Sequence, residues 1–319
     1  ETGGLQRIFH IGRQLRQLGD LTFVLVGNRC PEASLQATRR ELGEVIVMPP
    51  RERTPGLAGY WHYKLGKWRR VRPVSLANQR RFDQLLKSHD LVWFHTQEVA
   101  DAFRPRQYPH GVLDFNDLLQ LKLSQESELL PSGWDRWRGR LATGLARRRE
   151  LAALRQFGRL AVCSETDRRL LGNPPKVGVV ANGFTATADV PEHRSLRLGF
   201  IGYLDYGPNR DGLEWFAREV WPRVLAKQPK ARLRLVGRIS PKTALPIGDG
   251  IEPLGFVEDP ADEMASWSAM VVPIRFGGGT RIKIIEAFSR GCPVVSTPAG
   301  AYGLAVESGR ELLLADDSQ

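Results

Sequence analysis

The chain has 319 residues, of which 42% are hydrophobic and 25% charged, with a formal net charge of +11, as in a basic globular protein. No apolar run approaches the roughly 18 to 20 residues that span a bilayer, and no signal-peptide pattern opens the chain, so neither a membrane span nor secretion is predicted. The scattered cysteines Cys30, Cys163 and Cys292 give no disulfide framework or zinc spacing and favour a reducing, cytoplasmic setting.

Short apolar runs alternate with helical patterns along the first half of the chain. Their near-continuous apolar character, without strict alternation, predicts parallel strands that are covered on both faces. Strands are expected at 21–27, 45–48, 91–94, 111–115, 159–163 and 177–180. Helices are expected at 5–18, 32–42, 74–88 and 134–157, and Ser164 is expected to cap a further helix after Cys163.

A second alternation of strands and helices follows a connection rich in Pro, Ala and Thr. Strands are expected at 196–202, 232–237, 270–274 and over PVVST, with helices at 211–226 and 281–290. Two successive β/α alternations predict an α/β protein with two doubly wound, Rossmann-like domains that face each other across a cleft. We expect a first domain at 1–178, a linker at 179–195 and a second domain at 196–319, truncated at both ends of the chain.

The loop before the last predicted helix, FGGGTRIKIIEAF (276–288), combines three glycines with a threonine and two basic residues. Glycines let the backbone approach an anion closely, and the free N–H groups and dipole at a helix start favour a phosphate there. Thr280 can cap the helix, while Arg281 and Lys283 add positive charge. Glu286 would repel the phosphate itself, but its carboxylate suits the sugar or ribose hydroxyls of the next group of a ligand. The alternative is a flexible turn in which Lys283 and Glu286 form an ordinary i,i+3 pair.

Other polar residues near predicted strand ends leave two interpretations open. His95 follows the strand 91–94, where a lone histidine is more often structural than functional. Asp114 and Asp117 either position acceptor hydroxyls or cap the following helix. Asn209 and Asp211 are expected to cap a helix, with a sugar contact as the alternative. We find no Ser-His-Asp spacing, glycosidase-like carboxylate pair or metal cluster.

The positive charge is concentrated in the first half of the chain. Residues 1–180 carry a net charge of +12 and residues 181–319 one of −1. The densest stretch, 51–81, carries +8 interleaved with aromatic residues, and a second basic run lies around Arg136–Arg149. Such a face could meet nucleic acid, an anionic lipid surface or an acidic substrate, or it could simply be solvated.

Two stretches of the second half closely resemble the nucleotide-sugar-binding half of retaining GT-B glycosyltransferases. They read FIGYLDYGPNRDGLEWFAREVWPRVLAKQPKARLRLVGR and LGFVEDPADEMASWSAMVVPIRFGGGTRIKIIEAFSRGCPVVSTPAGAYGL. More narrowly, they are similar to glycosyltransferase family 4, the "glycosyl transferases group 1" domain. The first half is similar more loosely, through GGLQRIFHIGRQLRQLGDLTFVLVG, LDFNDL and VANGF.

This resemblance implies roles for individual residues, with departures from the family pattern. The family often has two glutamates eight residues apart, and the first would fall at Gly278. The basic residues usually found after the first donor-domain strand are absent, since Tyr203 follows Gly202, so Arg281 and Lys283 are expected to neutralise the diphosphate. Catalytic roles are expected for Asn116, Asp117, Arg281 and Lys283, and substrate contacts for Gly3, Gly4, Gly202, Phe256, Val257, Gly277, Gly278, Gly279, Thr280 and Glu286.

The function that the resemblance implies is transfer of a sugar from a nucleotide-diphosphate sugar to a glycan or lipid-linked acceptor, with retention of configuration. Neither a metal ion nor a cofactor is expected. We expect a cytoplasmic enzyme that meets an anionic membrane surface at the inner face of the membrane and does not bind nucleic acid. The alternative is a non-catalytic protein that binds nucleic acid or an acidic polymer through its basic first half.

Overall fold

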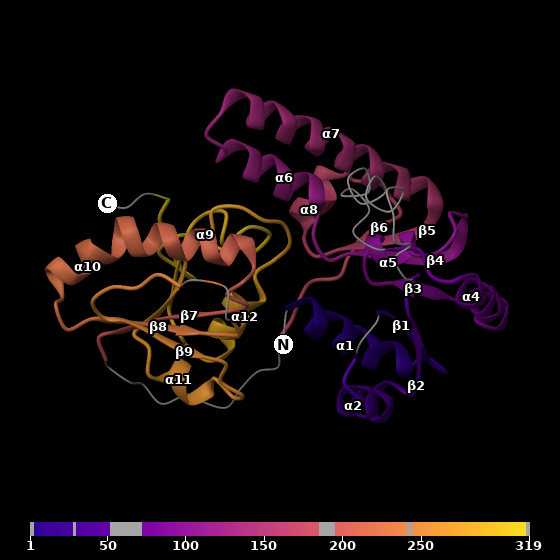
Figure 1. Cartoon of the computed structure of the whole chain (residues 1–319), viewed down its shortest axis with the longest axis horizontal. Coiled ribbons are helices and arrows are strands. Elements are labelled where there is room, and N and C mark those ends of the chain that lie inside the picture. Colours follow the sequence, from indigo (N-terminus) through magenta and orange to yellow (C-terminus); the bar gives the residue numbers. More distant parts are fainter. Residues whose placement is uncertain are drawn as a thin grey trace.

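The computed structural model describes residues 3–27, 30–51, 72–184, 195–240, 243 and 245–316. All paired strands in these ranges run parallel, as the near-continuous apolar runs predict. Figure 1 shows two groups of strands, β1 to β6 and β7 to β9, on opposite sides of the molecule, each accompanied by helices. The prediction of a Rossmann-like α/β fold with parallel sheets is confirmed.

The first half of the chain forms two parallel sheets. A two-stranded sheet has the order β1-β2 and a four-stranded sheet the order β3-β4-β5-β6. The strands are β1 (Thr22–Val26), β2 (Glu44–Met48), β3 (Val92–Phe94), β4 (Tyr108–Phe115), β5 (Phe157–Val162) and β6 (Val177–Val179). The helices are α1 (Gly3–Arg16), α2 (Glu32–Leu42), α4 (Leu76–Ser88), α5 (Gln97–Asp101), α6 (Leu119–Glu128), α7 (Gly133–Gln156) and α8 (Glu165–Leu170).

The second half forms one six-stranded parallel sheet with the order β12-β11-β10-β7-β8-β9. Its strands are β7 (Arg197–Ile201), β8 (Arg232–Val236), β9 (Ile251–Gly255), β10 (Ala269–Val272), β11 (Val294–Ser296) and β12 (Leu313–Leu314). Its helical segments are α9 (Gly207–Trp215), the π-helical turn η2 (Phe216–Val220), α10 (Trp221–Lys227), α11 (Ala261–Ala265) and α12 (Ile282–Ser289). Each half has its own buried hydrophobic cluster.

The helix predicted at 211–226 begins earlier, at Gly207, and is divided. Pro222 has no backbone N–H, so the helical hydrogen-bond pattern cannot run through it unchanged, and a π-helical turn precedes it at 216–220. Several short elements have no strong pattern in the sequence. The sequence therefore did not predict α5, α6, α11, β9 or β12.

Serine and threonine side chains define where four helices of the first half begin. The predicted cap Ser164 accepts a hydrogen bond from the N–H of Asp167 and so begins α8. Equivalent caps begin α4, α5 and α7. Most of the basic, aromatic stretch at 51–81 lies outside the described residues, as does much of the predicted linker. In the described ranges, no helix combines the length and apolar character needed to cross a bilayer.

Gly199, in the central strand β7, generates the first prediction. A Cβ atom at this position would lie 1.9 Å from Cδ2 of Trp267, which is buried. Gly199→Ala should therefore lower the free energy of unfolding by about 1 to 3 kcal/mol, because the indole must move within a packed core. Gly178→Ala in β6, where the nearest atom is 4.0 Å away, is the control. Equal chemical-denaturation midpoints for the two variants would contradict this packing argument.

Candidate functional site

The second sheet has a topological switch point between β7 and β10. From β7 the chain proceeds outward through β8 to β9, and then returns to place β10 on the other side of β7. In such sheets ligands bind beyond the carboxyl ends of the strands, where the strand order reverses. Gly202 follows β7 at this point, and the glycine-rich loop follows β10.

Lys283, in the first turn of α12, reaches this switch point. Its Nζ donates to Oδ1 of Asn209 at 3.1 Å and lies 3.9 Å from the centroid of the Phe200 ring. A Cβ atom at Gly202 would lie 2.9 Å from the same Nζ. Burial lowers the pKa of the Lys283 ammonium well below its ordinary value, and the charge of Arg281 acts in the same direction. An anionic ligand would offset both effects.

Arg281 folds back over the loop that precedes it. Its Nη1 donates to the carbonyl of Gly278 at 2.7 Å and its Nη2 to the carbonyl of Gly277 at 2.8 Å. Burial lowers the pKa of this guanidinium, while Tyr206 and Asp117 oppose the shift. The side chain thus holds the loop's shape, and its predicted contact with a diphosphate remains a prediction.

The loop glycines lie against the other half of the chain. A Cβ atom at Gly278 would be 3.0 Å from the Cβ of Asp117, and one at Gly279 would be 2.7 Å from the carbonyl oxygen of Asn116. The N–H of Gly277 donates to Oε1 of Gln125 in α6 at 2.8 Å. The structure therefore brings the predicted residues Asn116 and Asp117 together with the loop. The glycines also have a role the sequence did not suggest, which is close contact between backbones.

Thr280 does not cap α12, which corrects the prediction. The helix begins at Ile282 without a side-chain cap, and Oγ1 of Thr280 accepts a hydrogen bond from Nδ2 of Asn182 at 2.6 Å. The cap expected at Asn209 and Asp211 is also wrong, because α9 already begins at Gly207.

Asn209 and Asp211 instead have partners that connect α9 to the strand ends. Nδ2 of Asn209 donates to the carbonyl of Tyr203 at 2.7 Å, in addition to the contact with Lys283. Asp211 accepts from Nε of Arg275 at 2.8 Å. These bonds hold α9 against the segments that follow β7 and β10.

Glu286 lies one helical turn beyond Lys283. Burial raises the pKa of its carboxyl, and Arg290, whose Nη2 lies 3.4 Å from Oε1, partly opposes the shift. A partly buried carboxylate with one weak partner retains acceptor capacity for hydroxyl groups.

The remaining predicted contacts lie at other strand ends and at the start of α1. The exposed ring of Phe256 follows β9 with the guanidinium of Arg238 over it, 4.3 Å from its centroid, and Val257 packs partly buried beside the core. The sequence placed Gly3 and Gly4 before the first helix, whereas α1 begins at Gly3. Their predicted contact with substrate remains a prediction.

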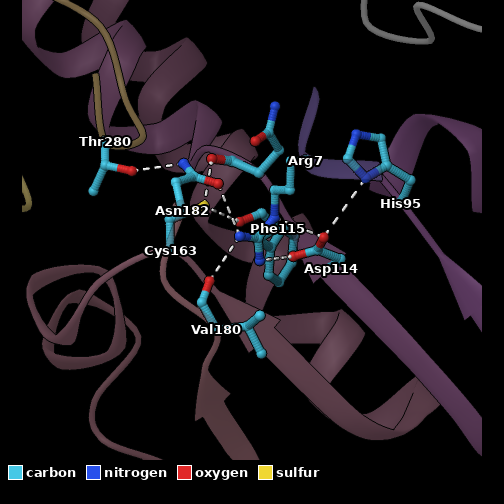
Figure 2. A network of polar contacts seen from close by, with 9 residues as sticks. Arg7, His95, Asp114, Phe115, Cys163, Val180, Asn182 and Thr280 are labelled. Carbon is cyan, nitrogen blue, oxygen red and sulfur yellow. Dashed lines mark hydrogen bonds and ion pairs between the residues drawn. The ribbon is translucent and has the colours of Figure 1, made fainter. Parts of the chain in front are cut away.

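A buried network centred on Arg7 links the two halves, as Figure 2 shows. The guanidinium forms two bonds with Asp114, at 2.9 and 2.7 Å, and donates to the carbonyl of Val180 at 2.7 Å and to Oδ1 of Asn182 at 2.9 Å. The side chain of Asn182 in turn donates a hydrogen bond to Thr280, which lies in the second half of the chain. The sequence offered two roles for Asp114. It does not cap α6, which has no side-chain cap, and both of its carboxylate oxygens bind Arg7. Its contact with acceptor hydroxyls remains a prediction.

His95 lies at the edge of this network, beyond β3. Its Nδ1 is 3.6 Å from Oδ2 of Asp114 and makes no hydrogen bond to the described residues. The side chain is mostly buried, so the histidine packs against the network from the side opposite to Asn182 (Figure 2).

The sequence did not suggest Glu150 as a functional residue. This buried glutamate of α7 accepts from the N–H of Gln120 at 3.2 Å, so it acts as a cap for α6, which has no cap of its own. Its Oε2 has no hydrogen-bond partner among the described residues and borders a small pocket that Asn116, Asp117 and Lys122 also line. Burial raises the pKa of its carboxyl to about 7.

The described residues contain no group of three or more His, Cys, Asp or Glu side chains arranged to hold a metal ion. Lys283, Arg281 and Arg238 place positive charge at the edge of the second sheet where its strands have their carboxyl ends. This edge therefore presents cationic groups and helix starts to a ligand, together with an exposed aromatic ring.

Comparison with known proteins relates this arrangement to glycosyltransferases. Residues 195–319 match the family described as Glycosyl transferases group 1. Over 129 residues the chain is 29% identical to a Klebsiella pneumoniae protein described as "Uncharacterized 44.6 kDa protein in cps region". That alignment covers 37% of this chain and 33% of the relative, so the match spans about a third of the relative's length.

Two solved structures share the whole architecture. Anabaena Alr3699/HepE, in complex with UDP and glucose, has a TM-score of 0.62 at 18% identity, over 100% of this chain and 83% of that chain. A glycosyltransferase from Rickettsia africae ESF-5 has a TM-score of 0.59 at 12% identity, over 99% and 82%. At these identities the likeness concerns the fold. The predicted GT-B fold is confirmed.

Glu150 generates a prediction about pH. Its carboxyl has a pKa of about 7 in the folded protein against an ordinary 4.5, so the ionised form opposes folding. The contribution of this group to stability is most favourable below about pH 4.5 and decreases as pH rises through about 7, by about 3 kcal/mol in total. Glu150→Gln keeps an acceptor for the N–H of Gln120 and removes the titration.

The measurement is urea denaturation of wild type and Glu150→Gln between about pH 5 and pH 8. The free energy of unfolding of wild type should fall relative to that of the variant as pH rises. Glu128→Gln, on the exposed side of α6, controls for replacing a carboxylate by an amide. A constant difference between wild type and Glu150→Gln across this range would show that the carboxyl is not perturbed.

Proposed function

We propose that this protein is a glycosyltransferase that moves a sugar from a nucleotide-diphosphate sugar to a glycan or lipid-linked acceptor, without a metal ion. The observation that carries the proposal is the position of Lys283. Its amino group lies at the switch point of the second sheet and, within the described part of the chain, donates to one neutral acceptor, Oδ1 of Asn209. The family match over 195–319 and the GT-B fold support the same function.

The diphosphate would bind at the carboxyl ends of β7 and β10. The ammonium of Lys283 and the start of α12 would neutralise its charge. Arg281 would bind the carbonyls of Gly277 and Gly278 and so keep them directed toward its own guanidinium. Glu286 would accept from the ribose hydroxyls. The exposed ring of Phe256 offers a face for the base. UDP is the nucleotide we propose first, since Alr3699/HepE is described in complex with UDP and glucose.

In the transfer step the bond between the sugar's anomeric carbon and the diphosphate breaks, and a bond to an acceptor hydroxyl oxygen forms. The nucleoside diphosphate leaves with the bonding electron pair, and the hydroxyl proton is released. Lys283 would stabilise the charge that develops on the leaving group, which is the electrostatic role that accelerates such reactions most. Retention of configuration is proposed from the resemblance to glycosyltransferase family 4.

The acceptor would enter from the first half of the chain. The pocket beside Asn116, Asp117 and Glu150 opens at the carboxyl ends of β3 and β4 and offers polar groups to hydroxyls. We propose a cytoplasmic enzyme that reaches lipid-linked acceptors at the inner face of a membrane. The alternative, a non-catalytic binder of nucleic acid or acidic polymer, predicts no nucleotide-sugar binding.

The first test is calorimetry with UDP, GDP and ADP. UDP should bind, because the negative charge of its diphosphate favours the charged form of Lys283 that burial disfavours. Lys283→Met should weaken binding by about 1.5 to 3 kcal/mol, since a charge-assisted contact is lost.

Two controls make this test decisive. Lys230→Met, at an exposed lysine of the same half, should leave binding unchanged. EDTA should also leave it unchanged if no metal ion takes part. Binding that EDTA abolishes would refute metal independence, and equal affinity of the Lys283→Met variant would refute the assignment of the diphosphate site.

The second test follows the sugar itself. With the preferred nucleotide sugar labelled at its anomeric carbon, and water as a slow acceptor, NMR should show that the first sugar released has the donor's anomeric configuration. Lys283→Met should abolish the release. Appearance of the opposite anomer first would overturn retention, and the absence of any transfer or hydrolysis from all donors tested would overturn the enzyme proposal.

A further inference from the structure

Helix α7 has one face that packs against the protein and an opposite face that is apolar and exposed. Its buried residues are Ala146, Glu150 and Ala153. The outward face carries Trp134, Trp137, Leu141 and Leu145, whose exposed fractions are 66, 53, 52 and 42%. Their spacing of three or four residues places them in one stripe along the helix. Figure 1 shows the α6–α7 pair at the outer edge of the molecule.

The stripe is organised rather than scattered. The indole rings of Trp134 and Trp137 stack with centroids 4.9 Å apart and planes inclined by 18°. Gly139 lies on the opposite face, where a Cβ atom would be 2.4 Å from the Cβ of Ser127, so α7 packs closely against α6. This contact fixes which face of α7 remains turned outward. Contiguous exposed apolar residues of this kind mark an interaction surface.

Exposed arginines flank the stripe on both sides. Segment 133–149 contains six arginines and a single acidic residue, Asp135. Arg149 pairs with Asp101. The other five make no ion pair within the described part of the chain, and all are exposed: Arg136, Arg138, Arg140, Arg147 and Arg148.

We propose that this face of α7 docks the protein on an anionic lipid bilayer, with Trp134 and Trp137 at headgroup level and the arginines on lipid phosphates. Tryptophan favours the headgroup region, and an apolar stripe bordered by arginine is the pattern of a helix lying in the membrane interface. A bilayer needs no groove on the protein, which suits a single convex helix. The charge of the face selects an anionic surface.

This inference is independent of the proposed sugar transfer. The stripe lies on the side of α7 opposite to Glu150 and far along the chain from Lys283. Docking can therefore be present in a protein that transfers no sugar, and absent from one that does. The two proposals fail in different experiments.

The experiment is co-sedimentation of the purified protein with vesicles of phosphatidylcholine and phosphatidylglycerol in equal parts, and with vesicles of phosphatidylcholine alone. Wild type should sediment with the anionic vesicles only, and added salt should weaken binding. Trp134→Ser with Trp137→Ser should reduce binding by about tenfold or more, since the apolar part of the interaction is lost. Replacing Arg136, Arg138 and Arg140 by glutamine should do the same through charge.

A matched control replaces two apolar side chains that are even more exposed elsewhere, Leu18 and Ile247, by serine. This variant should bind anionic vesicles as wild type does. Thermal unfolding of every variant verifies the fold, and the second, arginine variant keeps the test valid if the tryptophan variant is destabilised.

Three results would overturn the proposal. The first is unchanged vesicle binding by both α7 variants, which would place docking elsewhere on the chain. The second is equal binding to neutral vesicles. The third is a wild-type protein that does not bind vesicles but self-associates in light scattering or binds RNA in fluorescence anisotropy, with that property lost in the tryptophan variant. The stripe would then serve a protein or RNA partner.

Discussion

The buried pair of Arg7 and Asp114 holds together the parts that make up the site. An isolated charge at this depth would cost several kcal/mol, and the pair is tolerable because the guanidinium has four hydrogen bonds, to Asp114, Val180 and Asn182. These bonds fix α1 against β4 and the segment after β6. Asn182 then carries the connection to Thr280, beside the glycine-rich loop. Removing Arg7 would leave the fully buried Asp114 without its main partner, and Asn182, which binds Thr280, without one of its own hydrogen-bond partners.

The two sides of the interface present different groups. Where β7 and β10 end, cationic side chains lie beside the start of α12, and burial lowers the pKa of the Lys283 ammonium there. On the side of the first half, the pocket near Glu150 is lined by acidic, basic and uncharged groups, among them Asp117, Lys122 and Asn116. The glycine-rich loop lies against Asn116 and Asp117. Under the proposed function, the diphosphate would bind on the first of these sides and the acceptor hydroxyl on the second.

Local patterns in the sequence predicted most strands, the longer helices and the glycine-rich loop, because burial on both faces and amphipathic spacing leave marks on consecutive residues. The resemblance to glycosyltransferase family 4, rather than a local pattern, assigned Asn116 and Asp117 to the same site as the loop. Arg7 and Glu150 were missed since each is a charged residue in a helix, which usually means exposure, and their partners lie 107 and 30 residues away. Thr280 was assigned a local cap, whereas its partner Asn182 is 98 residues distant. Long-range polar contacts leave no periodic signal.

The contact of Gly278 with Asp117 has a consequence for how this chain can vary. Its loop has a glycine where the glycosyltransferases it resembles often have a glutamate. A side chain there would begin 3.0 Å from the Cβ of Asp117 and 3.1 Å from the carbonyl oxygen of Leu118. A glutamate at this position would therefore require Asp117 and Leu118 to move away by a few tenths of an ångström. Among related sequences, the residues at positions 278–279 and 116–118 should covary. Where a larger residue replaces a glycine of the loop, the backbone at 116–118 should lie further from the loop.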